Sequence, residues 1–350
     1  MIRFIVGVLV GVILLVFFAS TAGIHEMLMA LKSANYAYVL IGIAAYFVSL
    51  WLRTIRWRIL LINTKQIKVR RLLPVVIVGY MVNNVLPFRI GELVRSYFLS
   101  RRESVSTATG LSTILLERLM DSLALLLLIG ATSFFVPLST PLKKFSLSTN
   151  IDSTVLLAIF TLPFIFIFLG LVVVALNRKI ASRFVHFIAQ FLTESLKASL
   201  IQVTEKLLDG LKSLTDREQI TKSLLISIPI WIAESTLFYF IAFSLNIDEG
   251  FDGLVALFTA SILVTGITNI VSSIPAAPGG LGIFELVARE TLVYMPHGSI
   301  SRPEAAAFAA VTHTCLLLPP ILLGQIFLWF NGMSVISLSR NSRPSSKGMN

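Results

Sequence analysis

Charged side chains lie inside long apolar stretches of this sequence, where any ionic chemistry would take place at membrane depth. They are Arg89, Glu92, Glu117, Arg118, Asp121, Glu234, Glu285, Arg289 and Glu290. A charge at the bilayer centre costs about 2.5–3.5 kcal/mol on insertion scales, so such residues face a protein interior or a water-filled cavity. They gather around two helix breaks and one long span, which makes them candidates for binding a polar or ionic ligand.

The first break is the segment Asn83–Glu92. Pro87 removes a hydrogen-bond donor and ends the incoming helix, and Gly91 permits a tight turn or close packing. We expect the returning helix to begin near Ile90, where its free N–H groups and positive dipole end favour an anion. The guanidinium group of Arg89 has the planar geometry that binds phosphate with two hydrogen bonds. The segment therefore predicts an anion site.

The long span 108–136 carries two acids on one face. Glu117 and Asp121 are four residues apart, whereas Arg118 is turned away by about 100°. Two acids near a basic motif predict cross-helix ion pairs or one protonated acid, and proton coupling is a weaker alternative. The same pairing, with Arg89 and Glu92 as partners, is the structural alternative to phosphate binding at the first break.

The second break is the segment Pro275–Glu285. Its two prolines stop a helix and its three glycines expose backbone, at Pro275, Pro278, Gly279, Gly280 and Gly282. Glu285 and Arg289 follow in the next helix. A glycine-rich loop that leads into a helix N-terminus predicts a cradle for a phosphate or lipid head group. A kink that serves only packing is the alternative.

The composition excludes a soluble enzyme. Of 350 residues, 56% are hydrophobic and 13% are charged, whereas soluble domains have roughly 45–50% apolar and about 25% charged residues. The net charge of +11 comes from basic residues in the loops, which favours anionic lipid head groups over nucleic acid as partners. A single cysteine, Cys315, and scattered histidines predict neither a disulfide nor a metal or other cofactor.

Hydropathy predicts an all-α, polytopic membrane protein with about six full spans and two interrupted ones. The full spans are 2–19, 36–52, 108–136, 153–176, 223–245 and 303–331, and the interrupted stretches are 72–99 and 253–295. The first span is expected to stay uncleaved. The basic segments 53–71 and 177–222 should be cytoplasmic, the latter amphipathic and either lying on the inner leaflet or packed on other helices. Residues 1–335 form one predicted domain, and 336–350 a disordered tail.

The two interrupted stretches are expected to be re-entrant hairpins of opposite orientation. Basic flanks place both ends of 72–99 in the cytoplasm, and cytoplasmic N- and C-termini require 253–295 to return to the outside. The segment Gly91–Arg95 also resembles Phe284–Arg289. An inverted repeat whose broken helices meet at mid-membrane is typical of transporters, so we expect the charged residues of both breaks to line one hydrated chamber.

At these residues the sequence resembles the lysylphosphatidylglycerol synthase transmembrane-region family (flippase-like, UPF0104-type). Three ordered motifs carry the resemblance: Asn84-x-x-Pro87-x-Arg89-x-Gly91-Glu92, Glu117-Arg118-x-x-Asp121 and Pro278-Gly279-Gly280-x-Gly282-x-x-Glu285. The resemblance covers about residues 1–335 and implies a lipid-handling protein of a bacterial inner membrane or an archaeal membrane. The full synthase carries a soluble aminoacyl-transfer domain beyond the membrane region, so we expect no aminoacylation here.

The leading hypothesis is a translocase for an anionic phospholipid, a hopanoid or a polyprenyl-linked glycolipid. Arg89, Arg118 and Arg289 would contact phosphate, while Glu92, Glu117, Asp121 and Glu285 would balance charge or switch protonation. A membrane-embedded enzyme that acts on lipid phosphates is one alternative. A non-transporting subunit of a lipid-modifying or glycosyltransferase complex is another, and a homo-oligomer stays open. The lipid, the energy source and the direction are not predicted.

Overall fold

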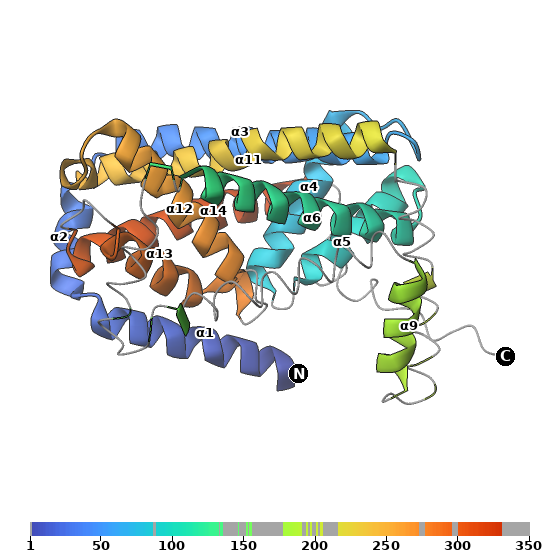
Figure 1. Ribbon diagram of the computed structural model, residues 1–350, viewed down its shortest axis with the longest axis horizontal. Helices are drawn as coiled ribbons and strands as arrows, with labels where there is room; N and C mark the ends of the chain where they lie inside the picture. The colour runs from blue at the N-terminus through green and yellow to red at the C-terminus, as the bar shows by residue number, and fades with distance from the viewer. Residues whose placement is uncertain are drawn as a thin grey trace. The chain divides into compact units, whose positions relative to one another are not determined.

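The described part of the chain is helical, as the sequence predicts. The computed structural model describes residues 2–86, 89–132, 134–135, 178–190, 216–272, 277–295 and 300–330, with isolated residues between 146 and 205. The α-helices are α1 (Ile2–Thr21), α2 (Ile24–Ser33), α3 (Tyr36–Leu61), α4 (Val69–Val85), α5 (Ile90–Glu103), α6 (Thr107–Thr132), α9 (Arg178–Ala189), α11 (Arg217–Ser244), α12 (Leu254–Ser272), α13 (Ile283–Val293) and α14 (Arg302–Phe330), shown in Figure 1. Two short 3-10 helices are η1 (Ile247–Gly250) and η2 (Pro278–Gly280).

Several of these helices are long and apolar enough to cross a bilayer, as expected of a multi-pass membrane protein. By length and composition they are α3, α11, α12 and α14. The pair α1 and α2, bent by 83° at a short break, would add a fifth if it is one broken span. The predicted span 153–176 lies outside the described residues except at 154–155. The total of six spans and the opposite orientation of the hairpins therefore stay predictions.

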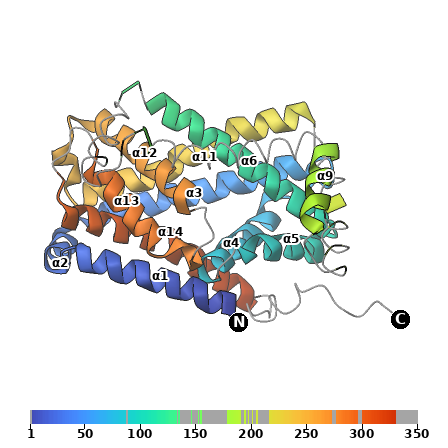
Figure 2. The ribbon, with the colours of Figure 1, turned by 60° about the horizontal axis from the view of Figure 1, so that its bottom comes forward.

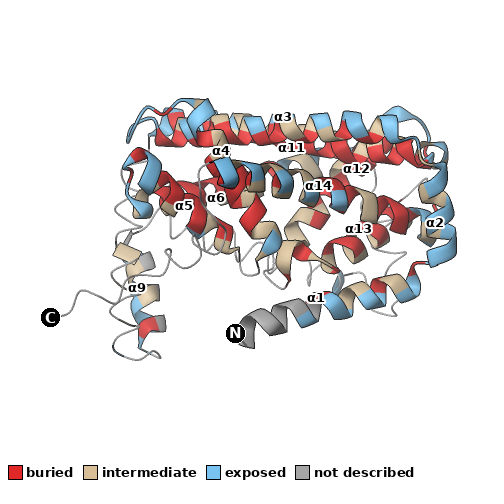
Figure 3. Cartoon of the chain, turned by 180° about the vertical axis from the view of Figure 1, so that it is seen from behind, coloured by how far each residue is buried: buried red, intermediate tan, exposed pale blue. Residues whose placement is uncertain are grey.

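The chain folds into two compact units. Unit 1 comprises Met1–Arg53, Asp121–Phe168 and Leu224–Leu318, and unit 2 comprises Thr54–Met120, Leu169–Ser223 and Pro319–Asn350. The boundary falls within α3, α6, α11 and α14. Figure 3 shows that α3 has one buried side and one exposed side along its length. Exposed leucines, isoleucines and valines on the outside of such helices are the surface expected to meet lipid.

Unit 2 is organised around the hairpin formed by α4 and α5, which lie side by side in Figure 2. A core of aliphatic and aromatic side chains, which includes Trp57, Leu72, Phe98 and Leu328, packs around it. The hairpin is tight because Gly91 faces Gly79. A Cβ atom on Gly91 would lie 2.1 Å from the carbonyl oxygen of Gly79.

Unit 1 contains the second interrupted stretch, in which α12 and α13 pack together and are joined through η2. Helix α1 packs against α13 and η2. The approach requires glycine at Gly282, which has a φ of 84° and where a Cβ atom would lie 2.4 Å from Cβ of Leu14. The ring of Phe238 packs against the rings of Phe284 and Phe308 beside this helix pair.

Two boundaries differ from the sequence prediction. Between the predicted spans 2–19 and 36–52, residues 24–33 form a further helix, α2, after a bend of 83° at a break that contains Gly23, whose φ is 66°. The span predicted to end at residue 52 continues to Leu61. Arg53 and Arg56 are therefore buried helix residues and not part of a cytoplasmic loop, because their carboxylate partners are close enough to neutralise them within the fold.

Candidate functional site

The first break places Arg89 directly before helix α5. Arg89 caps this helix in the left-handed region, with φ 52° and ψ 36°, and its carbonyl oxygen accepts a hydrogen bond from the N–H of Glu92 at 3.1 Å. A non-glycine residue in this region is uncommon, and such strain often accompanies function. Pro87 and Phe88 lie outside the described residues, and Asn84 is in the last turn of α4.

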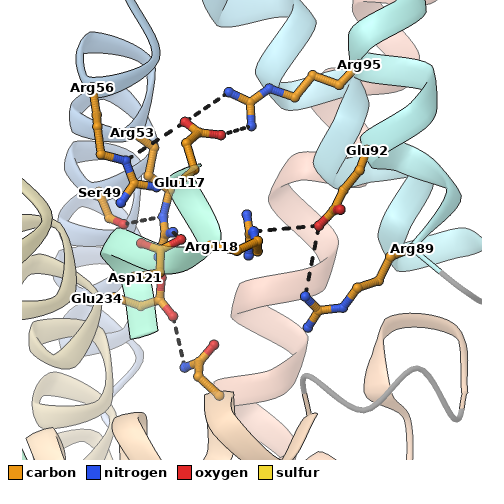
Figure 4. Close-up of polar contacts among 11 residues, drawn as sticks. Ser49, Arg53, Arg56, Arg89, Glu92, Arg95, Glu117, Arg118, Asp121 and Glu234 are labelled. Atoms are coloured by element: carbon orange, nitrogen blue, oxygen red, sulfur yellow. Dashed lines mark hydrogen bonds and ion pairs between the residues drawn. The ribbon is translucent and has the colours of Figure 1, made fainter. Parts of the chain in front are cut away.

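Two guanidinium groups converge on the carboxylate of Glu92 in the first turn of α5 (Figure 4). The Nε atom of Arg118 lies 3.6 Å and the Nη1 atom of Arg89 lies 4.0 Å from Oε1 of Glu92. The side chains of Arg89, Glu92 and Arg118 keep 35%, 26% and 30% of their surface exposed. This group, named the Glu92 cluster, can therefore be reached by an anion, and it lies at the positive end of α5.

A second ionic group in unit 2 is buried. Arg95 donates from Nη1 to Oε2 of Glu117 at 2.7 Å and from Nη2 to Oε1 at 3.2 Å. The Nε atom of Arg56 is 3.9 Å from the same carboxylate. The guanidinium group of Arg95 also lies 3.7 Å from the ring centroid of Trp57, whose Nε1 donates to Thr113 at 2.9 Å. These contacts hold α3, α5 and α6 together within unit 2.

A third ionic group is buried in unit 1 around Arg53. Its Nη2 atom lies 2.7 Å from Oε2 of Glu234, and its Nη1 atom lies 3.7 Å from Oδ2 of Asp121. The guanidinium group also lies over the ring of Trp231, 4.5 Å from its centroid. The amide of Asn269 donates to Oε1 of Glu234 at 3.1 Å. This network joins α3, α6, α11 and α12.

The second break is tied to α14 by an acid and a histidine. Glu285 accepts a hydrogen bond from the N–H of Gly282 at Oε2, 2.7 Å away, and its Oε1 lies 2.7 Å from Nδ1 of His313. The Nε2 atom of His313 is 3.0 Å from the carbonyl oxygen of Gly279. The imidazole ring is stacked on Phe284, with centroids 4.1 Å apart. Pro278 and Gly280 form the rest of η2 beside it.

Arg289 is occupied by contacts to α1 and to its neighbour in α13. It donates from Nη1 to Oγ1 of Thr21 at 2.8 Å and from Nε to Glu290 at 2.8 Å. Its guanidinium group is buried and lies 5.2 Å from the ring centroid of Phe18. These contacts are sufficient to explain the position of Arg289 in the structure. Its contact with a phosphate therefore stays a prediction.

The structure brings some predicted site residues together and keeps others in separate groups. The expected cross-helix ion pairs are confirmed. Glu117 pairs with Arg95 of α5, and Asp121 pairs with Arg53 of α3, so the two acids have different partners. The first break belongs to unit 2 and the second break to unit 1, so one shared chamber stays a prediction.

The sequence analysis did not identify Arg53, Arg56, Arg95 and Trp57 as site residues, and it treated the histidines only as scattered. The spacing of Ser49, Arg53, Arg56 and Leu60 by four, three and four residues was the available signal, since it marks one face of a helix.

Comparisons with known proteins identify the family of this chain. Residues 4–324 match the family model described as lysylphosphatidylglycerol synthase TM region. A UPF0104 membrane protein of Methanothermobacter thermautotrophicus is 26% identical over 318 residues, 87% of this chain and 88% of that protein. Another, of Pyrococcus horikoshii, is 22% identical over 95% of this chain and 98% of that protein. Glycosyltransferase AglD of Haloferax volcanii is 24% identical over 88% of this chain but 51% of its own length.

Proposed function

Because this chain belongs to the lysylphosphatidylglycerol synthase TM region family, we propose that it is a lipid translocase that receives an anionic head group at the Glu92 cluster. The observation that carries the proposal is the convergence of Arg89 and Arg118 on Glu92 while all three side chains stay partly exposed. The other arginines of the ionic groups described above are buried in contacts that hold helices together. The Glu92 cluster is thus the group that a ligand can join.

The chemistry of the Glu92 cluster suits a phosphate or phosphodiester. Two planar guanidinium groups can each donate two hydrogen bonds to phosphate oxygens, and the N-terminus of α5 adds partial positive charge. Glu92 holds both arginines when the head group is absent and limits how tightly an anion is retained. A transported lipid must be released again, so moderate affinity fits a translocase better than a closed, fully compensated site.

Acyl chains stay in the bilayer in this proposal, and only the head group crosses through protein. The exposed apolar side chains of the long helices are a suitable surface for the acyl chains to contact. Among the candidate lipids, the relative named as a glycosyltransferase favours a glycosylated lipid, and the two guanidinium groups favour one that carries a phosphate. An anionic phospholipid carries the same recognition group, the phosphate.

Reconstitution tests this function. Purified protein is placed in vesicles that contain fluorescent phosphatidylglycerol, phosphatidylcholine or a polyprenyl-phosphate sugar, and transbilayer movement is followed by quenching from outside. We expect faster movement of the anionic or phosphate-linked probe than in empty vesicles. Arg118→Gln should slow it, and Arg58→Gln, an exposed arginine on α3, should not. Movement equal to that of empty vesicles for every probe would contradict the proposal.

A non-transporting role has one observation in its favour. The matched region makes up about half of the glycosyltransferase-named relative, so this membrane region can accompany another segment in one protein. In that alternative the chain holds a lipid for a partner enzyme. Lipid binding without movement, together with co-purification of one fixed partner, would support it. Release of phosphate from a polyprenyl diphosphate, abolished by Arg89→Ala, would instead indicate a lipid-phosphate enzyme.

A further inference from the structure

A histidine and a glutamate hold the second break against α14, and the proposed head-group site does not use them. The Nδ1 atom of His313 and the Oε1 atom of Glu285 are 2.7 Å apart, and both side chains are buried. The contact joins α13 to α14 across 28 residues of sequence. Its neighbours in space are the stacked ring of Phe284 and the backbone of η2.

The hydrogen-bond partners fix where protons must lie. The carbonyl oxygen of Gly279 can only accept, so the Nε2 atom of His313, 3.0 Å away, carries a hydrogen. The Oε2 atom of Glu285 accepts from the N–H of Gly282. The remaining contact, from Nδ1 to Oε1, therefore needs one hydrogen. That hydrogen lies either on Nδ1, giving an ion pair, or on Oε1, giving two neutral groups.

Loss or gain of one proton breaks this arrangement. After loss, the lone pairs of Nδ1 and Oε1 face each other at hydrogen-bonding distance. After gain, Glu285 is protonated and neutral beside a positively charged imidazole, so the charge that favoured the contact is lost. A buried polar group left without its hydrogen bond is costly because water does not replace it. The observed contact between Glu285 and His313 thus requires one hydrogen shared between Nδ1 and Oε1.

The other titratable groups on the packed elements have partners of their own in the described structure. Glu234 of α11 contacts Arg53, Arg289 of α13 contacts Glu290, and Glu304 of α14 contacts Ser301. Helix α12 contains no titratable residue. Cys315 is two residues from His313 on the same helix and therefore faces another direction. The proton between His313 and Glu285 is thus controlled mainly by that pair.

We propose that Glu285 and His313 form a one-proton binding site whose occupancy holds the second break against α14. When the pair loses or gains a proton, the contact between His313 and Glu285 is lost, and the second break is held less firmly against α14. The site does not depend on which lipid the protein handles. It would let proton binding control a glycine-rich segment in which Gly279, Gly280 and Gly282 all have positive φ angles.

Hydrogen–deuterium exchange of the full chain in nanodiscs tests the proposal over a range of pH. The readout is protection of peptides that cover residues 277–286, corrected for the intrinsic pH dependence of amide exchange. Wild-type protection should pass through a maximum and fall by about tenfold on at least one side, as expected for loss of a charge-assisted hydrogen bond. A flat wild-type profile overturns the proposal.

The variant Glu285→Gln keeps both hydrogen bonds of residue 285 but removes the carboxylate that binds the proton. Its amide oxygen can accept from Gly282 and its amide nitrogen can donate to Nδ1 of neutral His313, so protection should persist at the alkaline pH where wild type loses it. His313→Phe keeps the stacked ring but no hydrogen bond, and should be poorly protected at every pH. Glu304→Gln is the matched control and should follow wild type. Identical profiles for wild type and Glu285→Gln, or full protection in His313→Phe, would overturn the proposal.

Discussion

The guanidinium group of Arg95 donates two hydrogen bonds to the carboxylate of Glu117 and also lies over the ring of Trp57. The two hydrogen bonds are 2.7 and 3.2 Å long, and the guanidinium carbon is 3.7 Å from the ring centroid. Both charged side chains are buried. This pair therefore stabilises a fold within apolar surroundings, whereas the partly exposed Glu92 cluster next to it on α5 remains accessible to a ligand.

Glu117→Gln should destabilise the protein strongly. The substitution keeps the shape but leaves the charges of Arg95 and Arg56 buried without their shared carboxylate. Removing one partner of a buried pair costs about 3–5 kcal/mol, and thermal unfolding in detergent measures the loss. Glu218→Gln is the matched control, since its exposed pair with Lys222 is worth about 0–1 kcal/mol. Equal melting temperatures for the two variants would contradict this role of Glu117.

Gly91→Ala should force α4 and α5 apart. The added Cβ atom would meet the carbonyl oxygen of Gly79 at 2.1 Å and Oδ1 of Asn83 at 2.5 Å. Overpacking of this kind costs about 1–3 kcal/mol or more. Gly130→Ala in α6 is the control, because no atom lies within 4 Å of its added Cβ. We expect a lower melting temperature for Gly91→Ala alone, and equal stability would show that the hairpin is looser than described.

Arg53→Lys should weaken unit 1 although the charge is kept. Lysine cannot contact Ser49, Asp121 and Glu234 together or lie flat over Trp231 as the guanidinium group does. We expect a loss of about 1–3 kcal/mol, the range for a hydrogen-bonded charged group, and a change in tryptophan emission. The exposed Arg58 provides the control Arg58→Lys. An unchanged emission spectrum and melting temperature would argue against the network.

The sequence predicted helices and buried acids better than it predicted their partners. Glu117 and Asp121 were recognisable because charges inside an apolar span must be compensated. Arg53 and Arg56 were assigned to a loop because the rule for basic flanks counts positive charge near span ends and does not detect that α3 continues to Leu61. The helical spacing of Arg53 and Arg56 places both arginines on one face of α3.

The close packing of the two breaks depends on tertiary contacts that no local pattern encodes. Gly91 and Gly282 were identified as glycines of a break, but their contacts with Gly79 and Leu14 come from segments that are distant or on another helix. The role of His313 likewise depends on its contacts with Gly279 and Glu285, which lie about 30 residues earlier in the chain. A lone histidine in an apolar span gives no indication of such partners.

Native mass spectrometry of lipid binding tests the central claim most directly. Purified protein is titrated with phosphatidylglycerol and with phosphatidylcholine, and the same titration is run on the double variant Arg89→Gln/Arg118→Gln and on Arg58→Gln. Loss of two partly screened contacts to phosphate should lower the affinity for the anionic lipid by about tenfold or more. We predict that the wild type and Arg58→Gln prefer phosphatidylglycerol and that the double variant loses this preference. An undiminished preference in the double variant would contradict head-group binding at the Glu92 cluster.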